Sequence, residues 1–253
     1  MKILKKIIQS EFGVKFRNSI KFRQIIVNLK NKENNYSISD AFPWRTDNNF
    51  KTFFRFLNIL EHFFNLKNSN AKIYFFDENG ELIKIKEIKN ISHNNDMIID
   101  KNLIGKEGYG SFYIFHETSE IDNNSIRNSC YTGFSYNDSL YSFVHGNTMG
   151  AYKNFNGDEN LERGIVETSL FRNNSYFVQK KFKDYEKVEF FFNNCSKNKI
   201  NFEIQNTRYS LEIGQSKIIN LNQSDLVRLK SNSMFLRPIA FLYKKNFIDV
   251  FHC

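Results

Sequence analysis

An internal repeat constrains the fold of this chain more than any other feature of its sequence. The stretch from Gly133 to His145 recurs in character, without a gap, from Ala240 to His252, and the offset is 107 residues throughout. Each copy predicts a strand, a polar turn, a second strand and a final histidine. Because a repeat means that one structural unit is built twice, it predicts the architecture before any single residue does.

Other predicted strands recur in order before each hairpin. Asn79-Gly80 is a strong hairpin signal after the strand Lys72–Phe76, and Val188–Phe192 stands where Ile73–Phe76 stood in the first copy. Short strands with turns every ~8–12 residues are typical of sandwiches and small barrels. We therefore predict an all-β fold of two tandem antiparallel sandwich-like units from an internal duplication, with minor helix.

Two segments before the first hairpin contain apolar residues in different patterns. Lys21–Lys30 contains five aliphatic or aromatic residues and predicts a strand. Lys51–Leu66 has partial helical spacing of apolar residues, yet the alternation of Phe54 and Phe56 also suits a strand. Helix and strand both stay open for this second segment.

The polar, turn-rich stretch from Asn154 to Asn160 predicts a boundary between the units. We expect an N-terminal segment at 1–20, a first unit at 21–153, a connecting segment at 154–166 and a second unit at 167–253. The units could form two sandwiches or two halves of a larger one. The N-terminal segment predicts a first strand or helix of the fold, with a short amphipathic helix on a membrane surface as the alternative.

The chain carries a formal charge of +9, which invites a nucleic-acid or anionic-membrane partner. The basic residues are interspersed with acidic ones, and the abundance of Lys, Asn, Ile and Phe together is typical of an A/T-biased coding sequence. We therefore disfavour nucleic acid as a partner and keep a basic protein that binds nucleic acid or an anionic membrane as a second alternative.

Three widely spaced cysteines, Cys130, Cys195 and Cys253, form no CxxC pair and do not suggest a disulfide framework. A reducing, cytoplasmic location is the simpler expectation. No apolar run approaches the ~20 residues of a membrane-spanning helix. Lys5 and Lys6 interrupt the apolar start of the chain, so we expect no secretory signal peptide.

The motifs of nucleotide-dependent enzymes and of the common hydrolases are absent from the sequence. There is no GxGxxG, GxxxxGK[ST], GxSxG or HExxH, and no zinc-type spacing of Cys and His. We therefore expect no cofactor and no metal, and we leave open whether the protein is an enzyme.

A catalytic hypothesis rests on four residues near the ends of predicted strands. His116 and Glu117 end one strand, while Tyr131 and His145 come close together if the hairpin closes near Asn137. Tyr and His can act as acid and base. Against this, each histidine could simply end a strand, and the repetition of His145 as His252 indicates a feature of the fold rather than of a site.

The candidate binding residues form two groups. Trp44, Arg45 and Asp47 place the only Trp of the chain beside a planar donor and a carboxylate, a combination suited to sugars or peptides. The opposing interpretation is that Trp44 closes the end of a core. Arg127 and Asn147 flank the first hairpin in a polar cluster that the second copy does not keep.

The preferred function is a non-catalytic binding or accessory module that recognises a carbohydrate or a protein partner. The first alternative is an enzyme that acts on a small or saccharide substrate through the Tyr/His residues of the first hairpin. The sequence gives no indication of the oligomeric state.

Overall fold

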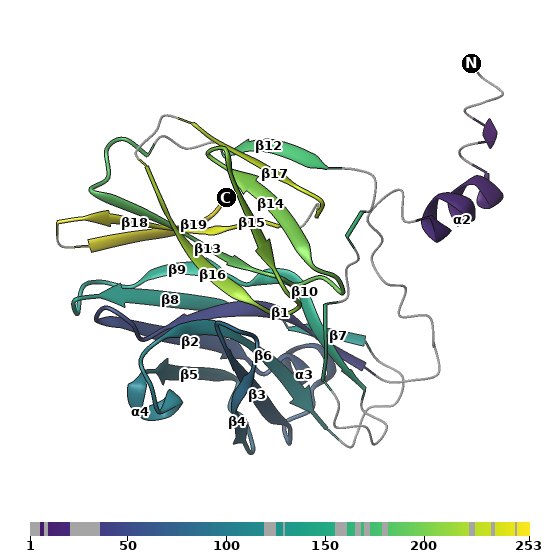
Figure 1. Cartoon of the computed structure of the whole chain (residues 1–253). Helices are drawn as coiled ribbons and strands as arrows, with labels where there is room; N and C mark the ends of the chain where they lie inside the picture. The colour runs from purple at the N-terminus through teal and green to yellow at the C-terminus, as the bar shows by residue number, and fades with distance from the viewer. Residues whose placement is uncertain are drawn as a thin grey trace.

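The structure is a computed structural model that describes residues 6–7, 10–20, 36–118, 125–128, 130–154, 161–164, 168–169, 173–178, 182–222, 226–233, 236–245 and 247–253. It is an all-β fold of two sandwiches, one above the other in Figure 1. The strand predicted at Lys21–Lys30 lies outside the described residues. The described helices are short, namely α2 (Glu11–Ser19), α3 (Ile59–Phe64) and α4 (Lys101–Ile104).

The first sandwich packs a large sheet against a sheet of four strands. The large sheet has the order β11-β10-β1-β6-β3-β4, with β7 parallel to β1, and the smaller one has the order β5-β2-β8-β9. The bounds are β1 (Tyr36–Arg45), β2 (Phe50–Leu57), β3 (Asn70–Asp77), β4 (Leu82–Ile88), β5 (Asn94–Ile99), β6 (Tyr109–Glu117), β7 (Ser125–Asn128), β8 (Tyr131–Tyr136), β9 (Ser142–His145), β10 (Asn147–Asn154) and β11 (Leu161–Arg163).

The second sandwich consists of two four-stranded sheets, β12-β17-β14-β15 and β16-β13-β18-β19. The bounds are β12 (Asn174–Val178), β13 (Lys187–Asn193), β14 (Ile200–Ile204), β15 (Thr207–Leu211), β16 (Ser216–Leu221), β17 (Val227–Ser231), β18 (Ile239–Lys244) and β19 (Phe247–His252).

The two sandwiches share one topology, as the repeat predicts. The order β16-β13-β18-β19 matches β5-β2-β8-β9, and β12-β17-β14-β15 matches the run β1-β6-β3-β4 of the large sheet. The detailed match of Val188–Phe192 with Ile73–Phe76 was wrong, because β13 occupies the place of β2 rather than of β3. Both β2 and β3 are rich in Phe, so composition alone could not separate them.

The ambiguous segment from Lys51 contains both a strand and a helix. Its alternating residues form β2, and α3 then begins after Asn58, whose side-chain oxygen accepts a hydrogen bond from the backbone N–H of Glu61. This is an ordinary N-cap arrangement. Asn65, in the left-handed conformation with φ of 57°, ends the helix.

Each sandwich has its own hydrophobic core, so the units are not two halves of one larger sandwich. Phe54, Phe75 and Phe112 lie in the first core, and Phe190 and Phe202 lie in the second. The boundary at 154–166 stays a prediction. Within it, β11 pairs with β10 and thus extends the large sheet of the first unit.

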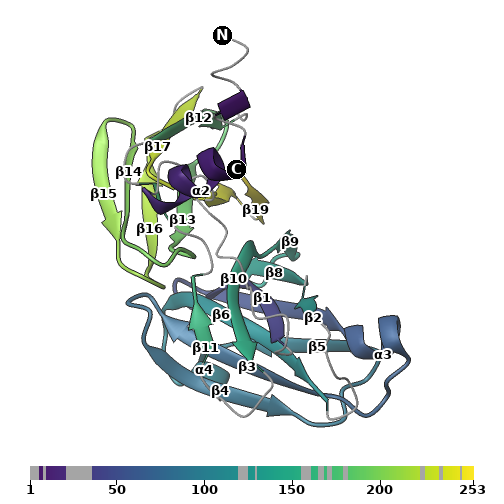
Figure 2. The same ribbon diagram turned by 90° about the vertical axis from the view of Figure 1, so that its right-hand side faces the viewer.

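A third apolar cluster joins the two units. The outer face of β13, β18 and β19 contributes Phe191, Phe241 and Val250, which pack against Phe50 and Phe134 at the end of the first sandwich. Phe241 meets Phe50 and Phe134 edge to face, with ring centroids 5.7 and 4.9 Å apart. Figure 2 shows β8 and β9 directly below the second sandwich. In the first unit, the outward-facing side chains of the equivalent strands β2, β8 and β9 do not belong to this cluster.

Candidate functional site

The outer face of the sheet β5-β2-β8-β9 exposes a set of aromatic side chains. In β2 the residues at even positions point into the core, so Lys51, Phe53 and Arg55 point outward. Phe53 lies opposite Gly133 of β8, and Gly133 lies opposite Phe143 of β9. One row of the sheet therefore places a glycine between two phenylalanines.

Gly133 allows the two aromatic rings to meet across β8. A Cβ atom at this position would lie 2.7 Å from Cε1 of Phe143, so the Phe143 ring lies directly over the glycine. The ring centroids of Phe53 and Phe143 are 5.9 Å apart with an interplanar angle of 88°, and Tyr141 lies 5.4 Å from Phe53. These contacts fix the orientation of three rings on the sheet surface.

We refer to Phe53, Tyr131, Tyr141 and Phe143 as the aromatic face. Tyr131 occupies the next row, between Arg55 of β2 and His145 of β9. Phe143 is 46% exposed and Tyr131 is 57% exposed. Rings of this size are usually buried, and a contiguous exposed group of them is a candidate binding surface.

Polar groups with fixed orientation border the aromatic face. Arg55 donates two hydrogen bonds to Asp96 of β5, at 2.7 Å from Nε and 2.8 Å from Nη2. Its guanidinium carbon lies 5.5 Å from the centre of the Phe53 ring. The hydrogen bonds from Arg55 lower the pKa of the Asp96 carboxyl.

A polar groove of about 560 Å³ adjoins the aromatic face at the turn end of β2 and β8. Lys51 lines the groove and lies on the same side of β2 as Phe53, and its Nζ lies 2.5 Å from Oδ1 of Asp138. The side chain of Asn49 donates to that of Asn137 at 3.0 Å. The groove thus offers amides, a carboxylate and an ammonium group next to the exposed rings.

The four candidate catalytic residues do not share a pocket. His116 is fully buried on the inner side of β6, where its Nε2 lies 2.9 Å from the carbonyl oxygen of Leu57. Glu117 points to the other side of the large sheet and contacts Lys153 at 2.5 Å and Lys72 at 3.3 Å. Both are therefore separated from the outer face of β8 and β9.

Tyr131 and His145 are directly opposite each other in the hairpin, which confirms the predicted proximity. His145 and His252 are equivalent, as the repeat predicts, because they end the matching strands β9 and β19 on the outward-facing side. The preceding strands match less well, since His252 lies opposite Ile239 and not opposite Pro238, which stands 107 residues after Tyr131. The equivalence of the two histidines indicates a feature of the fold.

The two histidines instead contact each other where the units meet. Their rings stack with centroids 4.3 Å apart, and Nε2 of His252 lies 2.8 Å from the carbonyl oxygen of His145. Burial, aided by the neighbouring His145, lowers the pKa of His252 to about 4. His252 is therefore neutral at physiological pH, and its role is in packing.

In the first group of candidate binding residues, Trp44 and Arg45 are buried and Asp47 is partly buried, so they do not form a ligand surface. Trp44 is fully buried, and its indole N–H donates to the carbonyl oxygen of Phe76 at 2.9 Å. The expectation that Trp44 binds a ligand is therefore wrong, because the ring is part of the first core.

In the second group of candidate binding residues, Asn147 is buried, on β10 opposite Ala41. Arg127 lies on β7 opposite Ile38, and its side chain is outside the described residues.

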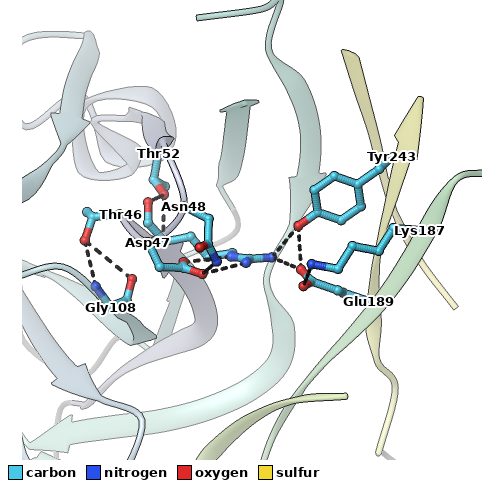
Figure 3. A network of polar contacts seen from close by, with 9 residues as sticks. Thr46, Asp47, Asn48, Thr52, Gly108, Lys187, Glu189 and Tyr243 are labelled. Carbon is cyan, nitrogen blue, oxygen red and sulfur yellow. Dashed lines mark hydrogen bonds and ion pairs between the residues drawn. The ribbon is translucent and has the colours of Figure 1, made fainter. Parts of the chain in front are cut away.

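Arg45 connects the two units through a buried network of charges (Figure 3). It donates from Nε and Nη2 to both carboxylate oxygens of Asp47, at 3.0 and 2.7 Å, and from Nη1 to Glu189 at 2.7 Å. Tyr243 and Lys187 also contact the Glu189 carboxylate, at 2.5 and 2.6 Å. All polar atoms of the Arg45 guanidinium group have partners within the protein, so this network is structural.

Burial disfavours the charged forms of Arg45 and Glu189, but the polar contacts of each side chain outweigh this effect of burial. The pKa of Arg45 is raised by Asp47, Tyr243 and Glu189 despite burial. The pKa of Glu189 is lowered, because Arg45, Lys187 and Tyr243 together overcome the effect of burial. Both groups are charged at neutral pH.

Sequence reasoning missed Phe53, Gly133 and Phe143 as candidate site residues. Two signals in the sequence could have found them. If residues 50–57 are read as a strand, Phe50, Phe54 and Phe56 lie on one face and Phe53 lies on the other. A glycine inside a predicted strand also marks a close approach by another group.

No protein-family model and no curated protein matches the chain. Among solved structures, the major pilin protein T-13 from Streptococcus pyogenes serotype GAS131465 aligns at 12% identity over 83% of this chain and 84% of that chain, with a TM-score of 0.22. The major pilin protein T3.2 from Streptococcus pyogenes serotype GAS13637 aligns at 10% identity over 86% and 96%, with a TM-score of 0.21. At these TM-scores the likeness shows neither a shared fold nor a shared function.

Proposed function

We propose that the protein is a non-catalytic module that recognises a carbohydrate through the aromatic face. The observation that carries this proposal is the exposed contact of Phe143 with Phe53 across Gly133, which leaves flat apolar rings on a rigid sheet. Sugar rings present C–H faces that stack on aromatic rings and hydroxyl groups that need donors and acceptors at the edge. Phe143 and Tyr131 are about half exposed, so a ligand would bury area that water now contacts.

The polar border of the aromatic face supports a sugar over a purely apolar ligand. Arg55 and Asp96 form a planar pair beside Phe53, with hydrogen-bonding capacity still directed to solvent. The groove beyond Lys51 supplies amides from Asn49 and Asn137. A small number of oriented polar groups next to aromatic rings is typical of sites that bind polar ligands specifically.

The open shape of the surface favours an extended polysaccharide over a free monosaccharide. The aromatic face spans β2, β8 and β9, and the groove continues from it at Lys51 and Asp138. Several adjacent sugar units would be needed to contact both parts. A protein partner remains the competing proposal for the same surface, since exposed aromatic residues and Arg are also enriched in protein interfaces.

Affinity electrophoresis tests this proposal. The wild-type chain is run through native gels containing soluble starch, xylan, laminarin or hydroxyethyl cellulose, and we expect at least one of these to retard it. Phe143→Ala should weaken that binding about tenfold, equivalent to about 1.4 kcal/mol, because one stacking ring is lost. Phe177→Ala removes a ring that is 57% exposed from β12 of the second unit and serves as the matched control.

Three results would contradict the proposal. None of the polysaccharides retards the chain, or Phe143→Ala and Phe177→Ala affect retardation equally, or Phe143→Ala alters self-association measured by light scattering without any effect on retardation. The third result would assign the aromatic face to a second copy of the chain. Thermal unfolding of both variants checks that the fold is intact, since neither ring lies in a hydrophobic core.

A further inference from the structure

Helix α2 carries an apolar stripe that no other part of the described chain covers. Phe12, Phe16 and Ile20 are spaced four residues apart and therefore lie along one side of the helix. Phe12 is 77% exposed, Phe16 is 57% exposed and Ile20 is 37% exposed. Figure 1 shows α2 apart from both sandwiches. The stripe is thus an apolar surface outside the two cores.

The helix is defined by local interactions and does not depend on packing against the sandwiches. Ser10 accepts a hydrogen bond on its hydroxyl oxygen from the backbone N–H of Gly13 at 3.1 Å, as an N-cap residue does. Lys15 and Glu11 form an i, i+4 ion pair at 3.4 Å, about 120° around the helix from the middle of the apolar stripe. One side of α2 is therefore apolar and another is charged.

The positive charge of the chain is concentrated around this helix. Residues 1–24 contain seven lysines and arginines against the single Glu11, an excess of six positive charges. The other 229 residues contain 29 basic and 26 acidic side chains, an excess of only three. The expectation that basic residues are evenly interspersed with acidic ones is therefore wrong for this segment.

We propose that α2 and the basic residues around it bind the surface of an anionic lipid membrane. An amphipathic helix with Phe and Ile on one side and Lys and Arg around it lies in the interface between headgroups and acyl chains. Each Lys or Arg near an anionic surface adds to the attraction. Among the described residues, no helix has the length and apolar character to cross a membrane, so the geometry points to a helix that lies on the surface.

The membrane is favoured over a groove on another protein by the charge around the stripe. Ile3, Leu4, Ile7 and Ile8 extend the apolar composition before α2, and Lys2, Lys5 and Lys6 are interleaved with them in the sequence. Ile7 is 57% exposed. Large apolar residues combined with this excess of one charge match the two components of membrane binding, insertion and electrostatic attraction.

Co-sedimentation of the full chain with vesicles tests the inference. We expect binding to vesicles of phosphatidylcholine and phosphatidylserine in equal parts, and little binding to pure phosphatidylcholine. Phe12→Ser/Phe16→Ser should weaken binding at least about tenfold, because two side chains no longer insert. Binding should also weaken as the salt concentration rises.

Two matched variants control for general effects of surface changes. Leu82→Ser/Ile213→Ser replaces two exposed apolar residues of the sandwiches, and Lys217→Gln/Lys245→Gln removes two exposed charges there. Both should bind vesicles like the wild type, whereas Lys5→Gln/Lys6→Gln should bind more weakly. The inference is overturned if the wild type does not sediment with anionic vesicles. It is also overturned if the α2 variants sediment like the wild type, or if they only change the oligomeric state measured by light scattering.

Discussion

At the scale of single residues, the most consequential position on the aromatic face is a glycine. Gly133 has no side chain, and this absence lets Phe143 lean across β8 to reach Phe53. The backbone at Gly133 does not need the left-handed conformation that only glycine adopts easily. Its requirement for glycine is therefore one of space above the sheet, which links it to the proposed site rather than to folding.

We predict that Gly133→Ala separates binding from stability. The new Cβ would lie 2.7 Å from Cε1 of Phe143, and because that ring is half exposed it can rotate away at little cost. Polysaccharide binding should fall about tenfold, as in Phe143→Ala, while the free energy of unfolding changes by less than about 1 kcal/mol. Affinity electrophoresis and urea unfolding measure the two effects.

The double variant Gly133→Ala/Phe143→Ala provides the internal check. If both changes act through the same ring, the double variant should bind no more weakly than Phe143→Ala alone. Additive losses would show that Gly133 affects the surface by another route. A large loss of stability in Gly133→Ala would show that the glycine is needed by the fold.

At the scale of secondary-structure elements, short helices depend on their caps because they have few internal hydrogen bonds. Helix α3 begins at the buried Asn58, whose Oδ1 accepts hydrogen bonds from the N–H of Glu61 at 3.2 Å and from the hydroxyl of Ser69 at 2.8 Å. Its side-chain amide donates to the carbonyl oxygen of Ile91 at 3.3 Å. One residue thereby joins α3 to two neighbouring loops.

We predict that Asn58→Ala destabilises the protein by about 2 kcal/mol, because three hydrogen bonds are lost in a buried setting. Asp100→Ala at the start of α4 is the matched control. Asp100 is only partly buried and caps through one hydrogen bond, from the N–H of Leu103 at 2.9 Å, so its loss should cost about 1 kcal/mol or less. Equal losses in urea unfolding would contradict the assignment of Asn58 as a joining residue.

At the scale of the whole molecule, the two units meet through an apolar cluster and a buried charge network. The network pairs Arg45 of the first unit with Glu189 of the second, and both side chains are almost fully buried. Removing one partner of such a pair leaves the other charge in a poor environment. The contact between units should therefore depend strongly on this pair.

We predict that Arg45→Met destabilises the protein by about 3–5 kcal/mol, the range for breaking a buried ion pair. The pKa of Glu189 in the folded state lies below its ordinary value of 4.5. The pair's contribution is therefore complete above that value and is lost as the pH falls through the folded pKa. Stability measured by urea unfolding from neutral pH downward should show this loss in the wild type.

Glu189→Gln is the control for the pH dependence. Without a titrating carboxyl at this position, the part of the acid destabilisation due to Glu189 should disappear, and the stability curve should be flatter below the ordinary pKa of the carboxyl. An unchanged slope in Glu189→Gln would mean that other carboxyl groups account for the acid sensitivity. The cytoplasmic location expected from the cysteines stays a prediction at this scale.

Local sequence signals predicted much of the fold because they describe interactions between near neighbours. The Asn79-Gly80 turn connects β3 and β4 as expected, with Gly80 at a φ of 81°. Phe112 and Ile114 face the first core from β6 as their spacing predicts, but Tyr113 and Phe115 on the other face of that strand are buried as well. The repeat also predicted two units of equal topology. The matching of individual strands was less accurate, because several strands share the same Phe-rich composition.

The sequence by itself determined that the chain forms two copies of one antiparallel sandwich, since strand patterns and turns depend on local chemistry and recur in both halves. It could not decide which outward-facing aromatic residues stay exposed. Phe191 and Phe241 point outward from the second unit's sheet and are buried against the first unit, while Phe53 and Phe143 point outward from the equivalent sheet and remain accessible. The reason is that the two units pack asymmetrically, so equivalent faces have different neighbours, and only the tertiary structure specifies which face is covered.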